Sequence, residues 1–200
     1  MAFDTFEEGI APGGLRSKNE IKILICYLYN SVGEKMSKEL ILNAVMEYEF
    51  ANFFEISSAF DELAENGTLI DSDEEDGEIY YILSDNGKMI ANQLETTLSY
   101  TVKEKSYSCA VKLLSERKTA RENTVEIEKT ENGLSVNCKI SGGTVELLSF
   151  SIYAPDFEQA QLMKKNFLSN PAAVYKTVLA LLSNDRESAG EALEEVYRIG

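Results

Sequence analysis

The sequence of 200 residues contains no histidine. This absence removes the most common general base, the most common zinc ligand and the side chain that titrates near neutral pH. It also excludes Ser-His-Asp and Cys-His nucleophile systems. Neither of the phosphate-binding patterns GxGxxG and GxxxxGKS/T occurs in the chain. An enzyme would need paired carboxylates, a lysine or a tyrosine, and no pair stands out. We therefore predict no catalytic residue, no cofactor and no metal ligand.

Cysteine is scarce and long apolar runs are absent. The three cysteines, Cys26, Cys109 and Cys138, are odd in number, widely spaced and set in apolar patterns, which predicts buried, reduced thiols. No apolar run reaches the roughly 18 residues that a membrane-spanning helix needs. Residues 1–14 are acidic and lack the basic and then apolar pattern of a signal peptide. This predicts a cytoplasmic protein that does not enter a membrane.

Basic residues are missing from one long segment. No lysine or arginine lies between Lys38 and Lys88, and the 49 residues of that interval carry 14 acids. The other 20 of the 34 acids face all 19 bases. Nearly the whole formal charge of −15 therefore lies in this basic-free segment, residues 39–87.

The patterns before residue 67 predict three helices. The first begins at the capping box of Ser17 and Glu20 and ends at Gly33. A second follows Ser37. The third begins at Asn52 and stops at Asn66-Gly67. The apolar stripe predicted for the third helix consists of Phe53, Ile56, Phe60 and Leu63.

The period then changes from helical spacing to alternation. Strands are predicted at Leu69–Asp73 and Glu78–Leu83, joined by an acidic turn. A fourth helix is predicted from Ser84. Its predicted stripe consists of Met89, Ile90, Leu94 and Leu98. Three helices, a strand, a wing, a strand and a helix follow the order of a winged helix-turn-helix, with the third helix in the recognition position.

The rest of the chain predicts a connector and a second domain. Residues 99–121 indicate a helix with six cations and two acids. Three alternating segments follow, with a type I′ hairpin turn predicted at Asn132-Gly133. A second turn is predicted at Gly142-Gly143, and a β-bulge near Leu147. Helices that begin at Asp156 and at Asn170-Pro171 are expected to cover the sheet.

These patterns together predict an α+β protein. Residues 1–14 would be a flexible arm, residues 15–98 a winged-helix domain and residues 99–121 a helical basic connector. Residues 122–200 would form an α+β domain, in which a three-stranded antiparallel sheet is packed with C-terminal helices.

The order of these features resembles a known bacterial family. The features are the Ser17-to-Leu98 pattern, the basic connector, the hairpin at 129–133 and the helix start at Asn170-Pro171. In this order they are similar to the domain-of-unknown-function family numbered 4364, over roughly residues 15 to 183. That family resembles winged-helix transcriptional regulators. The resemblance implies a DNA-binding-like winged helix followed by an α+β domain, and it implies no catalytic residue.

DNA binding through the third helix conflicts with charge. That helix offers four acids and no cation, whereas phosphate contacts supply much of the affinity for DNA. We therefore expect any DNA contact to come from cations of the first helix and the connector. The candidates are Arg16, Lys18, Lys22, Lys103, Lys105, Lys112, Arg117, Lys118 and Arg121. The alternative for the connector is a solvated helix face whose lysine stems cover apolar surface.

The leading prediction is a winged-helix protein of the transcriptional-regulator type, without catalytic activity and acting as a homodimer. The rival is a protein-interaction module that kept the fold, does not bind DNA, and attracts a basic protein or mimics DNA charge. Its candidate residues are the acids of the predicted turn: Asp73, Glu74, Glu75 and Asp76. The same turn fits no EF-hand register, and it can also be interpreted as an exposed loop that keeps the chain soluble.

Five tyrosines gather in the first half of the sequence: Tyr27, Tyr29, Tyr48, Tyr80 and Tyr81. They could surround a small-molecule pocket, as in a ligand-responsive regulator. Core and interface packing is the alternative interpretation of the same spacing.

Overall fold

The computed structural model describes residues 13–75 and 77–197. Within these ranges the chain is α+β, with eight α-helices and two separate three-stranded antiparallel sheets, which confirms the predicted class. The chain divides into two compact units between Glu116 and Arg117. The predicted arm lies almost wholly outside the described residues. None of the described helices combines the length and the apolar character needed to cross a membrane.

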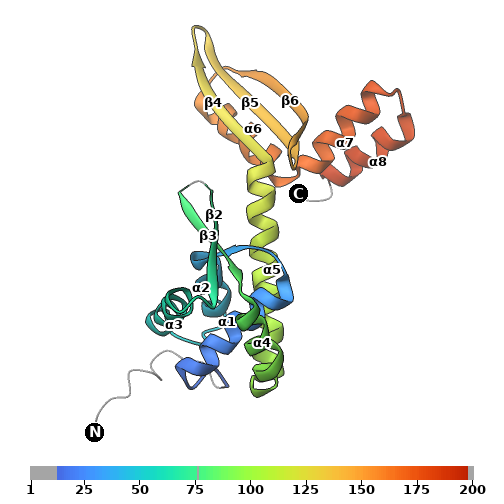
Figure 1. The fold of residues 1–200 in the computed structure, drawn as a ribbon. Coiled ribbons are helices and arrows are strands. Elements are labelled where there is room, and N and C mark those ends of the chain that lie inside the picture. Colours follow the sequence, from blue (N-terminus) through green and yellow to red (C-terminus); the bar gives the residue numbers. More distant parts are fainter. Residues whose placement is uncertain (1–12, 76, 198–200) are drawn as a thin grey trace. The chain divides into compact units, whose positions relative to one another are not determined.

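Helix α1 (Lys18–Val32) is the centre of the first unit, where it packs against α3 and α4 (Figure 1). Its capping box forms as predicted, because the Ser17 hydroxyl accepts from the amide of Glu20 and the Glu20 carboxylate accepts from the amide of Ser17. The helix ends at Gly33, whose left-handed φ of 72° few other residues tolerate. Helical spacing predicts an apolar stripe at Ile21, Leu24, Ile25, Leu28 and Val32; the first four are fully buried, and Val32 is partly buried.

A two-residue strand, β1 (Met36–Ser37), follows α1 and was not predicted. Two residues are too few to show an alternation, so the sequence carries no signal for it. The Tyr29 hydroxyl donates to the Met36 carbonyl oxygen at 2.9 Å and ties β1 to α1. Helices α2 (Lys38–Met46) and α3 (Phe53–Glu65) begin after their predicted caps, Ser37 and Asn52.

The first sheet has the strand order β1-β3-β2. Strand β2 (Leu69–Glu75) is two residues longer than predicted, because Glu74 and Glu75 pair with Ile79 and Glu78 of β3 (Glu78–Leu83). Most of the predicted acidic turn is therefore strand, and Asp76 lies outside the described residues. A bulge between Asp71 and Asp73 shifts the register of this hairpin.

The predicted fourth helix is shorter than its apolar pattern. Helix α4 (Asp85–Leu94) gives way to a 3-10 turn, η1 (Glu95–Thr97), so Leu98 lies outside the helix but is buried. Met89 and Leu94 were predicted to face the core, and this is wrong: 56% and 40% of their surface is exposed. Helix α5 (Tyr100–Glu122) follows, and its Val102, Cys109 and Ala110 join the first core.

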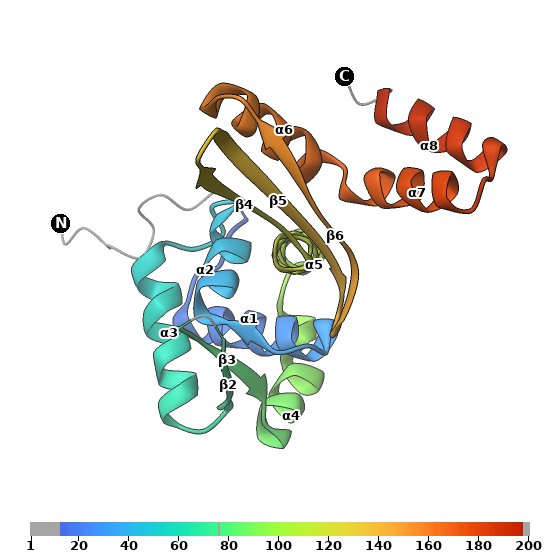
Figure 2. The same ribbon diagram turned by 90° about the horizontal axis from the view of Figure 1, so that it is seen from above.

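The second unit contains the predicted three-stranded sheet, β4 (Asn123–Thr130), β5 (Gly133–Gly142) and β6 (Val145–Ala154). Helix α6 (Phe157–Ser169) packs on one face of it (Figure 2), and Phe167 meets Phe150 edge to face. Helices α7 (Pro171–Leu182) and α8 (Arg186–Tyr197) pack on each other as a hairpin.

The predicted bulge is confirmed, since Ile140 pairs with Leu148 and Ser141 with Glu146, which leaves Leu147 unpaired.

The first hairpin turn of this sheet differs from the prediction. Thr130 pairs with Gly133, so the turn residues are Glu131 and Asn132. Asn132 has no positive φ, which a type I′ turn with Asn132-Gly133 at its centre would require. Gly133 is instead the first residue of β5, where a Cβ atom would lie 2.7 Å from the Tyr153 ring and 2.8 Å from the Ala154 carbonyl oxygen. The glycine is needed for close approach of β6.

We expect Gly133→Ala to lower the free energy of unfolding by about 1–3 kcal/mol, because the added methyl group overpacks a site bounded by backbone. Gly190→Ala in α8 is the matched control, since nothing lies within 4 Å of the added atom there. Urea unfolding of both variants measures the difference. Equal stability of the Gly133→Ala protein and the wild type would contradict the close approach.

Candidate functional site

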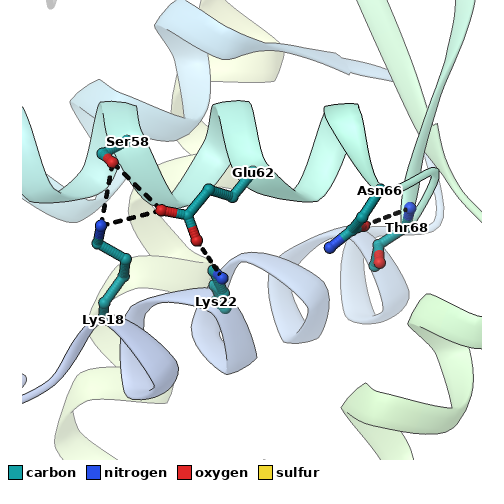
Figure 3. Close-up of polar contacts among 6 residues, drawn as sticks. All are labelled: Lys18, Lys22, Ser58, Glu62, Asn66 and Thr68. Carbon is teal, nitrogen blue, oxygen red and sulfur yellow. Dashed lines mark hydrogen bonds and ion pairs between the residues drawn. The ribbon is translucent and has the colours of Figure 1, made fainter.

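The two lysines of α1 that were predicted to contact DNA are both bound to one acid of α3. Lys18 and Lys22 lie one turn apart on α1, and the two oxygens of Glu62 accept one hydrogen bond from each ammonium group (Figure 3). The Lys18 Nζ lies 2.9 Å from Oε1 of Glu62. Like charges four residues apart on a helix repel each other, and Glu62 offsets that repulsion. These lysines therefore join α1 to α3.

The ion cluster shifts the pKa values of Glu62 and Lys18. Hydrogen bonds from Lys22 and Lys18 lower the pKa of the Glu62 carboxyl to about 2. The hydrogen bond to Glu62 raises the pKa of Lys18. Ser58 accepts from the Lys18 ammonium at 3.1 Å, which places a serine beside a lysine. A lysine with a raised pKa stays protonated and does not take a proton from serine, so this contact holds α1 and α3 together.

Lysines at both edges of the basic-free segment bind its acids. Lys38 donates to both carboxylate oxygens of Asp61, at 2.7 and 2.8 Å. Lys88 lies 3.0 Å from Asp85. Lys38 is the cation nearest to α3 in the sequence, and it is paired with Asp61. The acidic segment thus receives its counterions from residues outside it.

Two of the four acidic residues predicted to bind a protein are also engaged. Lys35 donates to Asp73 at 2.8 Å and to Glu75, and the first of these hydrogen bonds lowers the pKa of Asp73. Glu74 is exposed at the same strand. Asp76 lies outside the described residues. The structure therefore brings two of the four candidates onto one lysine instead of presenting a free row of carboxylates.

The connector cations are distributed around α5. The Lys103 ammonium lies 5.4 Å from the centre of the Tyr27 ring, and that of Lys105 lies 4.8 Å from the Tyr48 ring. Lys112 is 3.8 Å from Glu116. Contacts of this kind match the alternative interpretation, in which lysine stems cover apolar surface.

Helical spacing separates the six connector cations into two groups. At about 100° per residue, Lys105 and Lys112 lie together on one side of α5. The remaining four fall within about 100° of one another on the opposite side. These four are Lys103, Arg117, Lys118 and Arg121. Arg16, the remaining candidate, is exposed just before α1.

The five tyrosines take part in packing. Tyr29 and Tyr80 are buried, and Tyr81 meets Phe60 edge to face with ring centres 5.0 Å apart. The rings of Tyr27 and Tyr48 lie beneath the ammonium groups of Lys103 and Lys105. Of the two interpretations, core and interface packing describes these contacts.

All three cysteines are buried free thiols, as predicted. Burial raises the pKa of Cys26 to about 11, and it also raises the pKa values of Cys109 and Cys138. Thiols with raised pKa values contain little thiolate, the reactive form. They act here as small core side chains.

A groove of about 410 Å³ lies between α2, the start of α3 and β3. Its apolar lining includes Leu42, Phe53 and Ile79, and Lys38, Glu39 and Glu78 supply its charges. Phe53 was predicted to belong to the buried stripe of α3, which is wrong, because 49% of its surface is exposed. Its neighbour Phe54 is 80% exposed and meets it edge to face.

We expect Glu62→Gln to destabilise the protein, because it leaves Lys18 and Lys22 beside each other without a counterion. The pKa of Glu62 is lowered in the folded state, from 4.5 to about 2. Its stabilising contribution is therefore complete above about pH 4.5 and is lost as the pH falls toward 2. Urea unfolding of the variant and the wild type from neutral to acidic pH should show a difference that shrinks across this interval.

Glu65→Gln is the matched control for that measurement, since Glu65 lies one turn further on α3 and is exposed. A difference between Glu62→Gln and wild type that stays constant down to pH 3 would contradict an ionic origin.

Comparison with known proteins gives one match. No curated protein and no solved structure matches the chain. The sequence model of one family, described as domain of unknown function DUF4364, matches residues 21–182. This range includes Lys22 and Glu62 of the ion cluster and the whole lining of the groove. Because the match covers most of the sequence, this chain belongs to the DUF4364 family.

Proposed function

We propose that residues 15–98 form a winged helix that binds protein and does not read DNA through α3. The order α1, β1, α2, α3, β2, β3 supports the winged-helix assignment, since β1 pairs with β3 as the third strand of a small wing sheet. In this assignment α3 is the recognition helix and the β2–β3 hairpin is the wing. The family match carries no function of its own, so the proposal rests on the surface of these elements.

The observation that carries the proposal is the capture of Lys18 and Lys22 by Glu62. These lysines are the cations of α1 that were expected to hold the DNA backbone. Glu62 neutralises their charges within the domain, and Lys38 is similarly bound to Asp61. The start of α3 instead exposes Phe53 and Phe54. An apolar and acidic surface is suited to a protein partner and repels phosphates.

A DNA-binding regulator is the second candidate, and the arrangement of cations on α5 favours it. Lys103, Arg117, Lys118 and Arg121 fall on one side of that helix, by the helical spacing given above. We also propose that the protein is cytoplasmic and forms a homodimer. In a homodimer, two such sides would double the positive charge. Sedimentation at several protein concentrations measures the oligomeric state directly.

We expect random duplex DNA not to bind the wild-type protein at ~50 mM salt, where non-specific affinity is strong. Fluorescence anisotropy of a labelled duplex is the measurement. The Lys18→Glu/Lys22→Glu protein should behave in the same way as the wild type. Salt-dependent binding that the double variant loses would overturn the proposal, because it would show that the α1 lysines do contact phosphates.

If DNA binding is observed, the α5 candidate makes its own prediction. Reversing the charge of four residues removes their contacts with phosphates, so it should lower the affinity by at least about tenfold and also reduce its salt dependence. The four residues are Lys103, Arg117, Lys118 and Arg121, each changed to glutamate. Lys105→Glu/Lys112→Glu on the opposite side is the control and should change affinity far less. Equal losses in both proteins would reject a single DNA-binding side of α5.

A further inference from the structure

We propose that the outer edge of β6 pairs with the β6 edge of a second copy of this chain. Two three-stranded sheets then join into one antiparallel sheet across a two-fold axis. The inference goes beyond the protein-binding role proposed for residues 15–98, because it concerns the second unit. It rests on the proposed homodimer, to which it assigns an interface.

The second sheet ends at β6, since its strand order is β4-β5-β6 (Figure 2). Within residues 13–75 and 77–197, no strand pairs with the side of β6 that faces away from β5. The backbone N–H and C=O groups on that side are a template for another strand, and edge strands are commonly protected by lysine, proline or charges. After the bulge at Leu147, residues 148–154 contain none of these. This part of β6 is therefore open to pairing.

The face of β6 that belongs to the second core is incompletely covered, because α6 packs mainly on β5 and β4. Ile152 lies on this face, in register with Val136 and Ile127, yet 46% of its surface is exposed. Phe150 on the same face is only partly buried. A further strand beyond β6 would bury more of both side chains, which favours association.

The sequence of β6 is complementary to itself. Residues directly opposite each other in an antiparallel pair point to the same face of the sheet, so a two-fold axis perpendicular to the sheet preserves the two faces. In the register centred on Ser151, Phe150 lies opposite the partner's Ile152, and Ser149 lies opposite the partner's Tyr153. Apolar side chains then meet on the core face and hydroxyl groups meet on the other face. A second copy is therefore a fitting occupant of this edge.

The distribution of charge also favours a second copy at this edge. Residues 117–200 hold 12 acids and 10 bases, so the second unit carries only −2 of the formal charge of −15. Glu146 is the one charged residue of β6, and it is paired with Lys139 of β5 at 2.8 Å. Two copies can therefore approach through their second units with little repulsion.

The other edge of the sheet is unsuited to the same pairing. A two-fold pairing of β4 centred on Ile127 would place Glu126 directly opposite the partner's Glu128, and like charges in this position are destabilising. Pairing through β6 uses the same edge of both copies and leaves β4 outside, so the assembly closes as a dimer. An extended segment of a different protein is the other possible occupant of the β6 edge, and a monomeric wild-type chain would point to it.

The test compares glutamate substitutions at the two edges of the sheet in the full chain. The wild type should sediment as a dimer. Ser149→Glu/Ser151→Glu should raise the dissociation constant of the dimer by at least about tenfold, because both side chains are exposed on β6 and like charges would lie across the axis. Thr124→Glu/Thr130→Glu is the matched control, since it adds the same charge at exposed positions of β4. The control should leave the dimer unchanged.

Circular dichroism and thermal unfolding establish that both variants fold. A second measurement adds no charge. Ser151→Cys and Thr124→Cys each place one exposed thiol at an edge, while the three native thiols are buried. A short bismaleimide should link the Ser151→Cys protein into covalent dimers and the Thr124→Cys protein far less. Equal linking of the two proteins would overturn the proposal.

The outcomes separate this inference from the proposed function. A wild-type protein that stays monomeric at every concentration rejects the β6 pairing together with the homodimer. A dimer that the folded Ser149→Glu/Ser151→Glu protein retains rejects the β6 pairing alone and leaves the homodimer to another surface. Neither result alters the protein-binding role of residues 15–98, which the titration with duplex DNA tests.

Discussion

Burial of one face of α1 is the constraint on which the first unit depends. Ile21, Leu24, Ile25 and Leu28 are fully buried, and this fixes the rotation of the helix about its axis. Lys18 and Lys22 are then held toward α3, where Glu62 lies between them. The hydrophobic effect thus sets the position of the helix, and the ion cluster follows from it. Partly exposed ion pairs contribute modestly to stability, so their main effect here is to decide which charges of the domain neutralise one another.

This arrangement changes how the acidic segment is interpreted. In the sequence it contains 14 acids and no base. In the folded unit, lysines from before and after it reach Asp61, Glu62, Asp73 and Asp85. The segment is therefore less negative in space than in sequence, while the same pairs withdraw the α1 lysines from any external phosphate. Within the same segment, Phe53 and Phe54 remain exposed.

Local patterns predicted much of the fold. The caps at Ser17, Ser37 and Asn52 and the bulge at Leu147 depend on neighbouring residues, and all four formed as predicted. Strand β1 was missed because it has two residues and exists only through its pairing with β3. The hairpin register at Gly133 was missed because it is set by the close approach of Tyr153, which lies 20 residues away in the sequence. Phe53 and Met89 matched helical stripes but stay about half exposed.

The sequence by itself determined the order of helices and strands, the burial of the three thiols, the absence of histidine chemistry and the concentration of acids in residues 39–87. These properties follow from composition and from contacts within a few residues. Only the tertiary structure decided which charges neutralise one another and which aromatic residues stay exposed. The contacts of Glu62 with Lys18 and Lys22 span 44 and 40 residues, and that of Lys35 with Asp73 spans 38. Pairing over such separations is set by how buried faces dock, and no local pattern encodes it.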